Sequence, residues 1–379
     1  MNIKESYDVI VVGGGVAGVA AAVSASREGS RVLLIEKSFN LGGLATGGLI
    51  SWYEPLCDGA GKQIIYGIAE ELIRLSGKYG FENLPEKWGG DGKNKPRNER
   101  YSTFYSPGIF SATLDEYVEE NGVELLFDTL ATYPVMNERH CEGVVVENIN
   151  GREYYSAKIV IDATGTAAIM HRAGVPTVEG KNYMTYIAHW YNIDMVKKLN
   201  EDGDVCAFRK WMNTGSDMFG NGHPEGMDMI SGVTAEGLTK YMLEGKKSFL
   251  RKISQNHHHS FDVMSIPDMP QLRTIRRIIG KCDFNAIDGE TYEDSIGTCG
   301  DFRPDGASKH YQIPFGSLYN EKFDNMLAVG RIISAPQGDG WEVARVIPVC
   351  ALTGEVAGKA AAFCVKHDCG LNEFSMQVK

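Results

Sequence analysis

The chain has 379 residues, of which 43% are hydrophobic and 23% charged, so it can bury a large core and a mainly disordered protein is excluded. Its 38 basic and 49 acidic side chains give a formal net charge of −11. That balance disfavours a protein that holds nucleic acid by neutralising phosphates, and a small-molecule ligand is the expectation.

The N-terminal residues lead directly into an apolar strand pattern, without a leader of basic and then apolar residues, so no signal peptide is expected. Glycine and charged residues interrupt the apolar runs before any of them reaches about 18 residues, so we expect no membrane-spanning segment. The eight cysteines are scattered through a chain too long to need a disulfide framework. Together these features predict a reduced, cytoplasmic protein.

The first predicted strand covers residues 7–12, and its continuous β-branched residues are typical of a parallel sheet that is covered on both faces. The glycine-rich turn 13–18 follows at once. A predicted helix rich in alanine covers 17–27, and a second strand over 31–35 is closed by Glu36. Strand, glycine turn, helix, strand and acidic residue thus occur in the order of a dinucleotide-binding unit.

Each marker residue of this unit has a mechanical role in binding a dinucleotide. Gly13 allows the tight turn, Gly15 lets the backbone approach a pyrophosphate, and Gly18 lets the helix pack on the sheet. Glu36 lies 18 residues beyond Gly18, close to the spacing at which an acidic side chain meets the ribose hydroxyls. A glycine turn that binds no ligand is the alternative, which the complete order of elements disfavours.

Residues 42–48 hold four glycines in seven positions, which indicates backbone lying against a flat ligand. With this segment the chain resembles the FAD-dependent oxidoreductases built on the glutathione-reductase type of Rossmann fold, and within them a broad group of bacterial flavoproteins. Further matching segments are 59–64, 68–72, 161–165, 324–331, 345–348 and 353–358. The resemblance implies an α/β fold, a Rossmann-type FAD-binding domain whose parallel sheet is discontinuous in sequence, and FAD as the cofactor.

The resemblance also implies cofactor contacts beyond the first unit. They are Lys37, Gly42, Gly43, Thr46, Gly47, Ala163, Thr164, Gly165, Gly330, Arg331 and Ile347. A helix predicted from about Pro348 would point its N-terminal dipole at the pyrimidine edge of the flavin, where negative charge gathers on reduction.

The cofactor domain is expected to combine residues 1–175 and 316–379, with a second α+β domain over 176–315 that roofs the flavin and binds the substrate. Loop 84–100 is polar and holds three glycines, and it is either a mobile lid over the substrate cleft or a plain solvated loop. Helical spacing of apolar residues predicts a helix over 106–121. Further strands are predicted at 123–127, 143–146, 153–155, 158–161 and 326–329.

The flavin carries the chemistry of such enzymes, so the protein must position the substrate and tune the local charge. Arg345, just before the final helix, is the candidate cation for the reduced flavin; a surface arginine paired with Glu342 or Glu355 is the alternative. Arg273 and Arg276 lie in a segment that also matches the resembling group. A cation pair facing the cleft would fix a carboxylate or another anion, whereas solvated strand charges are the alternative.

Residues 257–259 are three consecutive histidines. His258 is the candidate catalytic acid or base among them, with structural histidines as the default interpretation. No carboxylate or cysteine stands at a partner spacing, so no metal site is expected. Cys364 and Cys369 have the separation of the redox disulfide of disulfide reductases, but they follow the last helix instead of the first βαβ unit, so that activity is disfavoured.

The sequence holds no second glycine fingerprint for a built-in nicotinamide domain and no Cys-x-x-Cys cluster for iron and sulfur. Electrons must therefore enter from the substrate, a transiently bound nicotinamide or a separate donor or acceptor protein. We predict an FAD-dependent oxidoreductase that moves a hydride between a small organic substrate and flavin N5 in a cleft between two domains. One alternative is a flavoprotein subunit that relays electrons to a protein or RNA-modification partner; the other is a flavin-binding module without turnover. Neither nucleic acid nor a membrane is an expected partner.

Overall fold

The computed structural model describes residues 3–90, 100–217, 219–255, 260–303, 306–336 and 338–377. Its main sheet has the strand order β5-β2-β1-β8-β7-β6, with β16 also paired to β8. The parallel part consists of β1 (Glu5–Val12), β2 (Val32–Ile35), β5 (Glu124–Leu126), β16 (Met326–Ala328) and the last residues of β8 (Gly151–Asp162). Val9, Ile10 and Val11 of β1 are fully buried, as expected of a strand covered on both faces.

The other edge of this sheet is antiparallel. Strands β6 (Leu130–Asn137) and β7 (His140–Asn148) form a hairpin, and β7 pairs with the first half of β8. The predicted separate strands 153–155 and 158–161 are therefore one strand of 12 residues, because Ser156 and Ala157 between them carry no break in the extended backbone. The outcome confirms an α/β fold class with a mixed rather than a purely parallel sheet.

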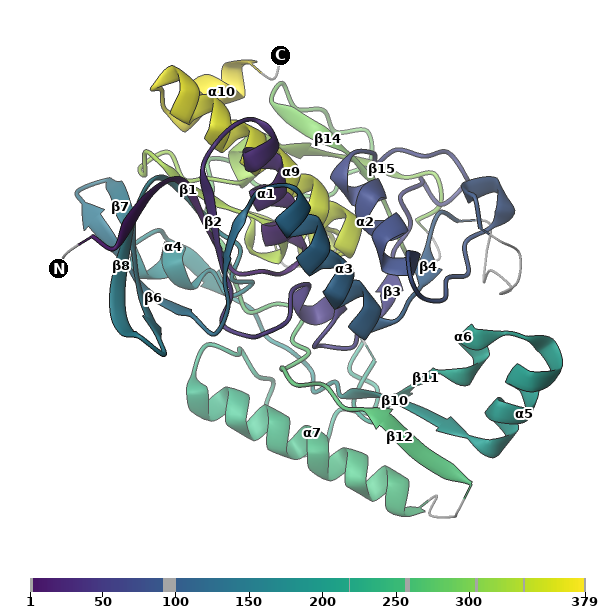
Figure 1. The fold of residues 1–379 in the computed structure, drawn as a ribbon. Coiled ribbons are helices and arrows are strands. Elements are labelled where there is room, and N and C mark those ends of the chain that lie inside the picture. Colours follow the sequence, from purple (N-terminus) through teal and green to yellow (C-terminus); the bar gives the residue numbers. More distant parts are fainter. Residues whose placement is uncertain are drawn as a thin grey trace.

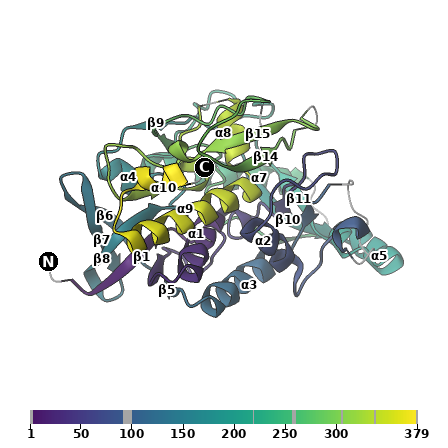
Figure 2. The same ribbon diagram turned by 90° about the horizontal axis from the view of Figure 1, so that it is seen from above.

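Helices α1 (Val16–Arg27) and α9 (Ile347–His367) pack closely side by side over one face of the main sheet (Figures 1 and 2). The small residues predicted on the last helix make this approach possible. A Cβ atom on Gly354 would lie 2.1 Å from the carbonyl oxygen of Ala17, and one on Gly358 would lie 2.3 Å from that of Ala21. Helices α2 (Ile68–Gly77) and α3 (Pro107–Glu120) lie beside this pair.

One described helix, α9, is long and apolar enough to cross a membrane by length and composition, with a mean hydropathy of 1.3 in its most apolar window. The expectation that no segment reaches this length is therefore wrong for α9, because its glycines and few charges do not interrupt the apolar run. In the structure, 61% of that window is buried, as in the core helix of a globular domain. Length and composition alone are weak evidence for a membrane span.

A second layer lies below the main sheet in Figure 1. It contains a sheet of β11 (Lys210–Asn213), β10 (Ile187–Asn192) and β12 (Phe261–Ser265), with α7 (Ala235–Gln255) against it and α5 (Ile193–Asp202) and α6 (Val205–Phe208) at one end. Tyr186, Tyr241 and Phe249 belong to a separate buried core here. We refer to β10–β12 with α5–α7 as the roof. The domain boundaries at 175 and 315 stay predictions.

The remaining elements are short. They are β3 (Trp52–Tyr53) with β4 (Thr103–Phe104), β9 (Thr177–Glu179) with β13 (Arg276–Ile278), β14 (Ser295–Gly300) with β15 (His310–Pro314), α4 (Ala168–Arg172), α8 (Asp339–Ala344), α10 (Leu371–Gln377), and the 3-10 turns η1 (Gly43–Ala45), η2 (Glu86–Trp88), η3 (Phe315–Ser317) and η4 (Gly330–Ile332). Residues 91–99, within the predicted lid or solvated loop, lie outside the described residues, so that alternative stays open.

Candidate functional site

The glycine turn after β1 has two positions that only glycine fits. Gly13 has a φ of +106°, and a Cβ on it would lie 2.5 Å from the carbonyl oxygen of Ala163. A Cβ on Gly18 would lie 1.8 Å from the carbonyl oxygen of Gly13. The turn and the close approach of α1 to the sheet therefore account for these two glycines without any ligand.

Gly15 is different, because nothing in the chain requires glycine there. Its φ of −65° suits any residue, it is the N-cap of α1, and no described atom outside its neighbours lies within 4 Å of a Cβ built on it. The space in front of it faces the first N–H groups of α1, where the helix dipole favours an anion. This is a cradle that a side chain would fill, and it fits a pyrophosphate.

Glu36 is fixed beside this turn by both of its carboxylate oxygens. Oε2 accepts a hydrogen bond from the Gly14 N–H at 2.7 Å, and Oε1 accepts from the N–H and hydroxyl of Ser38, both at 2.8 Å. The side chain is only 8% exposed. The next residue, Lys37, is exposed.

The predicted glycine loop 42–48 lies directly against the glycine turn. The Gly42 N–H donates to the carbonyl oxygen of Gly14 at 2.8 Å, and a Cβ on Gly43 would lie 3.4 Å from the Gly15 Cα. Thr46 is buried and its hydroxyl donates to the carbonyl oxygen of Leu41. On the other side, Gly47 faces Asp268, since a Cβ there would lie 2.5 Å from the Asp268 carboxylate. The loop thus connects the turn with the part of the chain that follows the roof.

The turn Ala163-Thr164-Gly165 after β8 is held by Asp162, which sequence reasoning did not single out. The fully buried carboxylate accepts hydrogen bonds from the Thr164 N–H and hydroxyl and from the N–H groups of Ile169 and Met170. Burial raises the pKa of Asp162, although these donors oppose the shift. An acidic residue at the end of a buried strand, followed by small residues, was the available signal.

Gly330 and Arg331 complete this edge of the sheet. Gly330 has a φ of +71°, and its N–H donates to the Thr353 hydroxyl at 3.0 Å. Arg331 is partly buried and donates from Nε to the carbonyl oxygen of Gly165 at 2.8 Å and from Nη1 to that of Leu272 at 2.7 Å. Burial lowers the pKa of Arg331 to about 10.

Arg345 lies two residues before α9, whose first residue is the predicted contact Ile347. The guanidinium forms an ion pair with Glu342, and its Nε lies 3.0 Å from Oε2 of that carboxylate. Of the two pairings considered as alternatives to a flavin contact, the structure therefore contains the one with Glu342. Glu355 is not its partner, because that carboxylate accepts from the Ile68 N–H and from Lys359. Arg345 remains a cation within electrostatic reach of Arg331 and Arg273.

Arg273 and Arg276 have different hydrogen-bond and ion-pair partners, and their joint role stays a prediction. Arg273 is partly buried, donates from Nη1 to the Thr185 hydroxyl at 3.1 Å, and has its pKa lowered by burial and then by Arg345. Arg276 lies on β13, where its nearest carboxylate is that of Glu179 at 3.8 Å. The two side chains have different surroundings, so the structure joins Arg273, but not Arg276, with Arg345. His258 lies outside the described residues.

Glu54 is a second residue that sequence reasoning missed. Burial raises the pKa of the Glu54 carboxyl to about 7. The hydrogen bond from Trp52 and the charges of Arg345 and Arg100 lower this pKa, but by less than burial raises it. The indole Nε1 of Trp52 donates to Glu54 Oε2 at 3.2 Å. A carboxyl group with a pKa near 7 can release or take up a proton at neutral pH. No local sequence pattern marks it, because its burial depends on distant segments.

A cavity of about 400 Å³ lies where the main-sheet part meets the roof. Its lining comes from both parts: Ser51, Phe81, Asn83, Phe104 and Tyr105 from one, and Asp204, Cys206, Ala207, Arg209, Lys210 and Trp211 from the other. We call this the inter-layer cavity. Ser51 connects its walls, because its Oγ accepts from Trp211 Nε1 at 3.2 Å and lies 3.3 Å from Nε2 of the buried His189.

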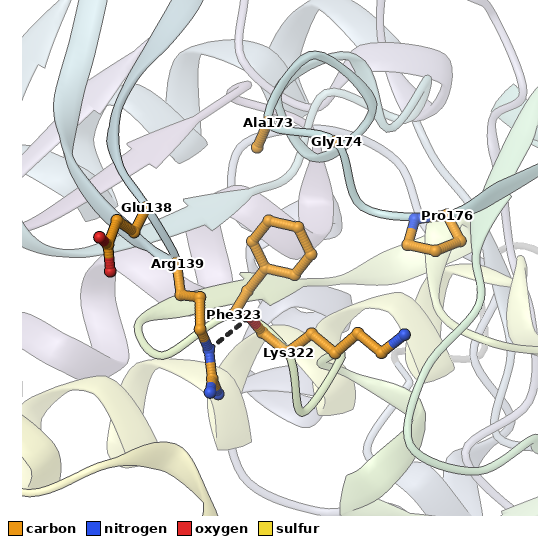
Figure 3. A pocket seen from close by; sticks show the side chains of 7 residues that line it. All are labelled: Glu138, Arg139, Ala173, Gly174, Pro176, Lys322 and Phe323. Carbon is orange, nitrogen blue, oxygen red and sulfur yellow. Dashed lines mark hydrogen bonds between the residues drawn. The ribbon is translucent and has the colours of Figure 1, made fainter.

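A larger concavity of about 480 Å³ lies elsewhere, between the β6–β7 hairpin, α4 and the chain before β16 (Figure 3). Arg139 on its wall donates from Nε to the carbonyl oxygen of Lys322 at 2.9 Å. None of its lining residues belongs to the glycine turn, the 42–48 loop or the start of α9. Its size therefore does not make it the candidate site.

Metal and disulfide chemistry find no support in the described part of the chain. No group of three or more His, Cys, Asp or Glu side chains there is placed to hold a metal ion. None of the eight cysteines forms a disulfide, and burial raises the pKa of Cys364 to about 12, so its thiol is a poor nucleophile at neutral pH.

The profile of the family described as FAD dependent oxidoreductase matches the chain over residues 8–263 and 188–378. A digeranylgeranylglycerophospholipid reductase from Methanoculleus marisnigri is 26% identical over 203 residues, which cover 51% of this chain and 47% of the relative. The tRNA uridine 5-carboxymethylaminomethyl modification enzyme MnmG from Lactococcus lactis is 28% identical over 172 residues, which cover 44% of this chain and 26% of the relative. The chain thus spans about half or less of the length of these curated relatives.

Among solved structures, p-nitrophenol 4-monooxygenase PnpA from Pseudomonas putida DLL-E4 superposes with a TM-score of 0.53 at 12% identity, covering 96% of this chain and 81% of that one. At that identity the likeness shows a shared fold and nothing about the substrate.

Proposed function

The chain belongs to the FAD dependent oxidoreductase family, and from that premise we propose that it moves a hydride between flavin N5 and a small organic substrate held in the inter-layer cavity. FAD is the cofactor of this family, and bound FAD supplies the two-electron chemistry. The remaining tasks fall to the protein: it holds the dinucleotide, orients the substrate and manages the accompanying proton.

The residues around the glycine turn fit the dinucleotide. The open space at Gly15, in front of the α1 N-terminus, suits the pyrophosphate, and the fixed carboxylate of Glu36 stands where a ribose would lie. The backbone of Gly42 and Gly43 faces the same space. The turn 163–165 and the Gly330–Ile332 segment close its other side through the Arg331 bond to Gly165.

The observation that carries the substrate assignment is the position of the inter-layer cavity. Ser51 and Tyr105 lie on its main-sheet side, and the Tyr105 hydroxyl donates to the carbonyl oxygen of Ala45, inside the 42–48 loop, at 2.9 Å. The wall of the cavity is therefore bonded to the loop proposed to contact the cofactor. The cavity lies between two layers and combines aromatic side chains with polar and charged ones, and such concave sites between layers commonly hold small molecules.

Three side chains supply the charge and the proton transfer that the reaction requires. Arg345 and Arg273 place positive charge near the start of α9, and together with the helix dipole they favour a negatively charged ligand there. Glu54 is the proposed proton donor or acceptor, since its pKa of about 7 keeps both of its forms populated at neutral pH. Trp52 connects it to the cavity wall, because its ring lies 4.5 Å from that of Phe104.

The test is an anaerobic screen of the FAD-loaded protein against alcohols, amines, enoates and sugars, with the flavin absorbance as the signal. A true substrate bleaches the oxidised flavin, or reoxidises flavin that has been photoreduced beforehand. The variant Ala207→Leu, which narrows the inter-layer cavity, should weaken this response, whereas Ala173→Leu in the larger concavity should not. FAD content measured in both variants separates lost substrate binding from lost cofactor. An equal effect of the two substitutions contradicts the assignment of the cavity.

A further inference from the structure

Arg209 is a cation of the inter-layer cavity with no carboxylate partner among the described residues. It follows α6 and precedes β11, and its guanidinium lies 5.6 Å from the centre of the Phe81 ring. Its hydrogen bond is made by Nη1, which donates to the Ser106 hydroxyl at 3.3 Å. The Nε atom is buried without a hydrogen-bond partner.

This arrangement leaves one edge of the guanidinium free. Since Nη1 is bonded to Ser106, the Nε and Nη2 donors remain, and they form the flat two-donor edge that binds a carboxylate with two parallel hydrogen bonds. A partly buried cation without a counter-ion is costly, and desolvation accordingly lowers the pKa of Arg209. A bound anion would remove that cost.

The neighbouring polar groups do not supply the missing anion. Asp204 lines the same cavity, but its carboxylate caps α6 and accepts from the Ala207 N–H at 3.2 Å. His189 is 1% exposed and its Nδ1 is a second buried atom without a partner. Burial, followed by the charge of Arg209, lowers its pKa to about 4, so the imidazole is neutral at pH 7 and adds no charge.

Aromatic side chains form part of the cavity wall. Phe81, Phe104, Tyr105 and Trp211 contribute to the lining, and the rings of Phe104 and Trp211 meet edge to face with their centres 5.9 Å apart. Such walls suit a flat apolar body. A volume of about 400 Å³ has room for one ring with a short side chain and an acidic group.

We propose that the inter-layer cavity selects an organic carboxylate with a flat apolar body, whose carboxylate binds the Nε–Nη2 edge of Arg209. This inference rests on the proposed function, because it names the substrate class of the same cavity. It is a binding role: Arg209 holds the acid group while the apolar body lies along the aromatic wall. The net charge of −11 makes a dedicated cation necessary, because the chain as a whole repels anions.

The test measures binding of matched acids and amides to the full-length, FAD-loaded protein by titration calorimetry. Benzoate, phenylacetate and cinnamate are compared with benzamide, phenylacetamide and cinnamamide, which have nearly the same shape without the charge. We expect at least one acid to bind about tenfold or more tightly than its amide, as a charge-assisted bidentate contact requires. Arg209→Gln should abolish this preference and leave amide binding unchanged, and Arg209→Lys should restore part of it.

The adjacent Lys210 provides the control, because Lys210→Gln removes the same unit charge from an exposed side chain of the same cavity lining. Loss of the acid preference in Arg209→Gln but not in Lys210→Gln supports the inference. No acid preference in any matched pair, or equal losses in both variants, overturns it. The FAD content is read from the absorbance of the same samples. A protein that binds FAD without preferring acids contradicts this inference alone, and a protein that binds no FAD contradicts the proposed function.

Discussion

The Nε–H of Arg331 donates a hydrogen bond to the carbonyl oxygen of Gly165 across 2.8 Å, which joins the turn after β16 to the turn after β8. A second bond runs from Nη1 to the carbonyl oxygen of Leu272, in the chain between the roof and β13. One partly buried guanidinium thus holds three segments that are distant in sequence. Although burial lowers its pKa to about 10, Arg331 stays charged at neutral pH.

Replacing Arg331 with Met should destabilise the protein by about 3 kcal/mol, because two carbonyl groups lose their donor in a place with little access to water. Urea unfolding measures the loss. Arg139→Met is the matched control, since Arg139 also donates to two carbonyl oxygens, those of Glu321 and Lys322, but its side chain is 61% exposed. Water replaces those bonds, so the control should lose less than about 1 kcal/mol. Equal losses would show that burial is not what makes the Arg331 bonds important.

Gly15→Asp should separate cofactor binding from stability. Aspartate is a favourable N-cap residue, the φ of −65° suits it, and its side chain meets no described atom within 4 Å of Cβ. The melting temperature of the apo-protein should therefore stay the same or rise. FAD binding should be lost, because the carboxylate occupies the position of the pyrophosphate and repels its negative charge. Gly18→Ala should instead lower the melting temperature of the apo-protein, because the added Cβ would lie 1.8 Å from the carbonyl oxygen of Gly13. A Gly15→Asp protein that still binds FAD tightly would place the pyrophosphate elsewhere.

Glu54 should make stability depend on pH in the neutral range. Its pKa rises from 4.5 to about 7 on folding, so its contribution is complete below pH 4.5 and is lost as the pH rises through 7. The side chain introduced by Glu54→Gln stays neutral at every pH. The free energy of unfolding of this variant, relative to that of the wild type, should therefore rise by on the order of 3 kcal/mol as the pH rises from 4.5 to 8.5. Unfolding curves at the two pH values give this difference, and Glu120→Gln at the exposed end of α3 is the control. A gain that is the same at both pH values contradicts the shifted pKa.

His189 should act in the acid range with the opposite sign. Its pKa falls from 6.5 to about 4 on folding, so its contribution is complete above pH 6.5 and is lost as the pH falls through 4. As the pH falls from 6.5 to 4, the free energy of unfolding of the wild type should therefore drop by on the order of 3 kcal/mol more than that of His189→Gln. The measurement is the difference between their melting temperatures across that range. Parallel curves would mean that His189 is not held in its neutral form.

Sequence reasoning succeeds where the signals are local. The β-branched run of β1, the spacing of Gly13, Gly15 and Gly18, and the acid at the end of β2 all lie within 36 residues, and the structure places them side by side. The family resemblance then predicts the FAD-binding fold class. These features could be predicted because neighbouring residues determine them.

The chemistry of the cavity depends on contacts across long distances in the chain, and sequence reasoning missed it for that reason. Arg209 meets Ser106 across 103 residues, and Ser51 meets His189 across 138. Nothing near Glu54 in sequence indicates that its carboxyl is desolvated enough to raise its pKa. The joint role of Arg273 and Arg276 stays a prediction. Arg276 begins β13, whereas Arg273 lies in the irregular segment before it, so the period of a strand does not fix how their side chains are oriented relative to each other.

The assignment of a flavoenzyme depends on FAD binding at the β1–α1 turn. The decisive experiment records absorbance spectra of the purified full-length chain and then releases and quantifies the flavin. We expect about one FAD per chain in the wild type and almost none in Gly15→Asp at unchanged stability. A colourless wild-type protein that stays without flavin after incubation with excess FAD would contradict it.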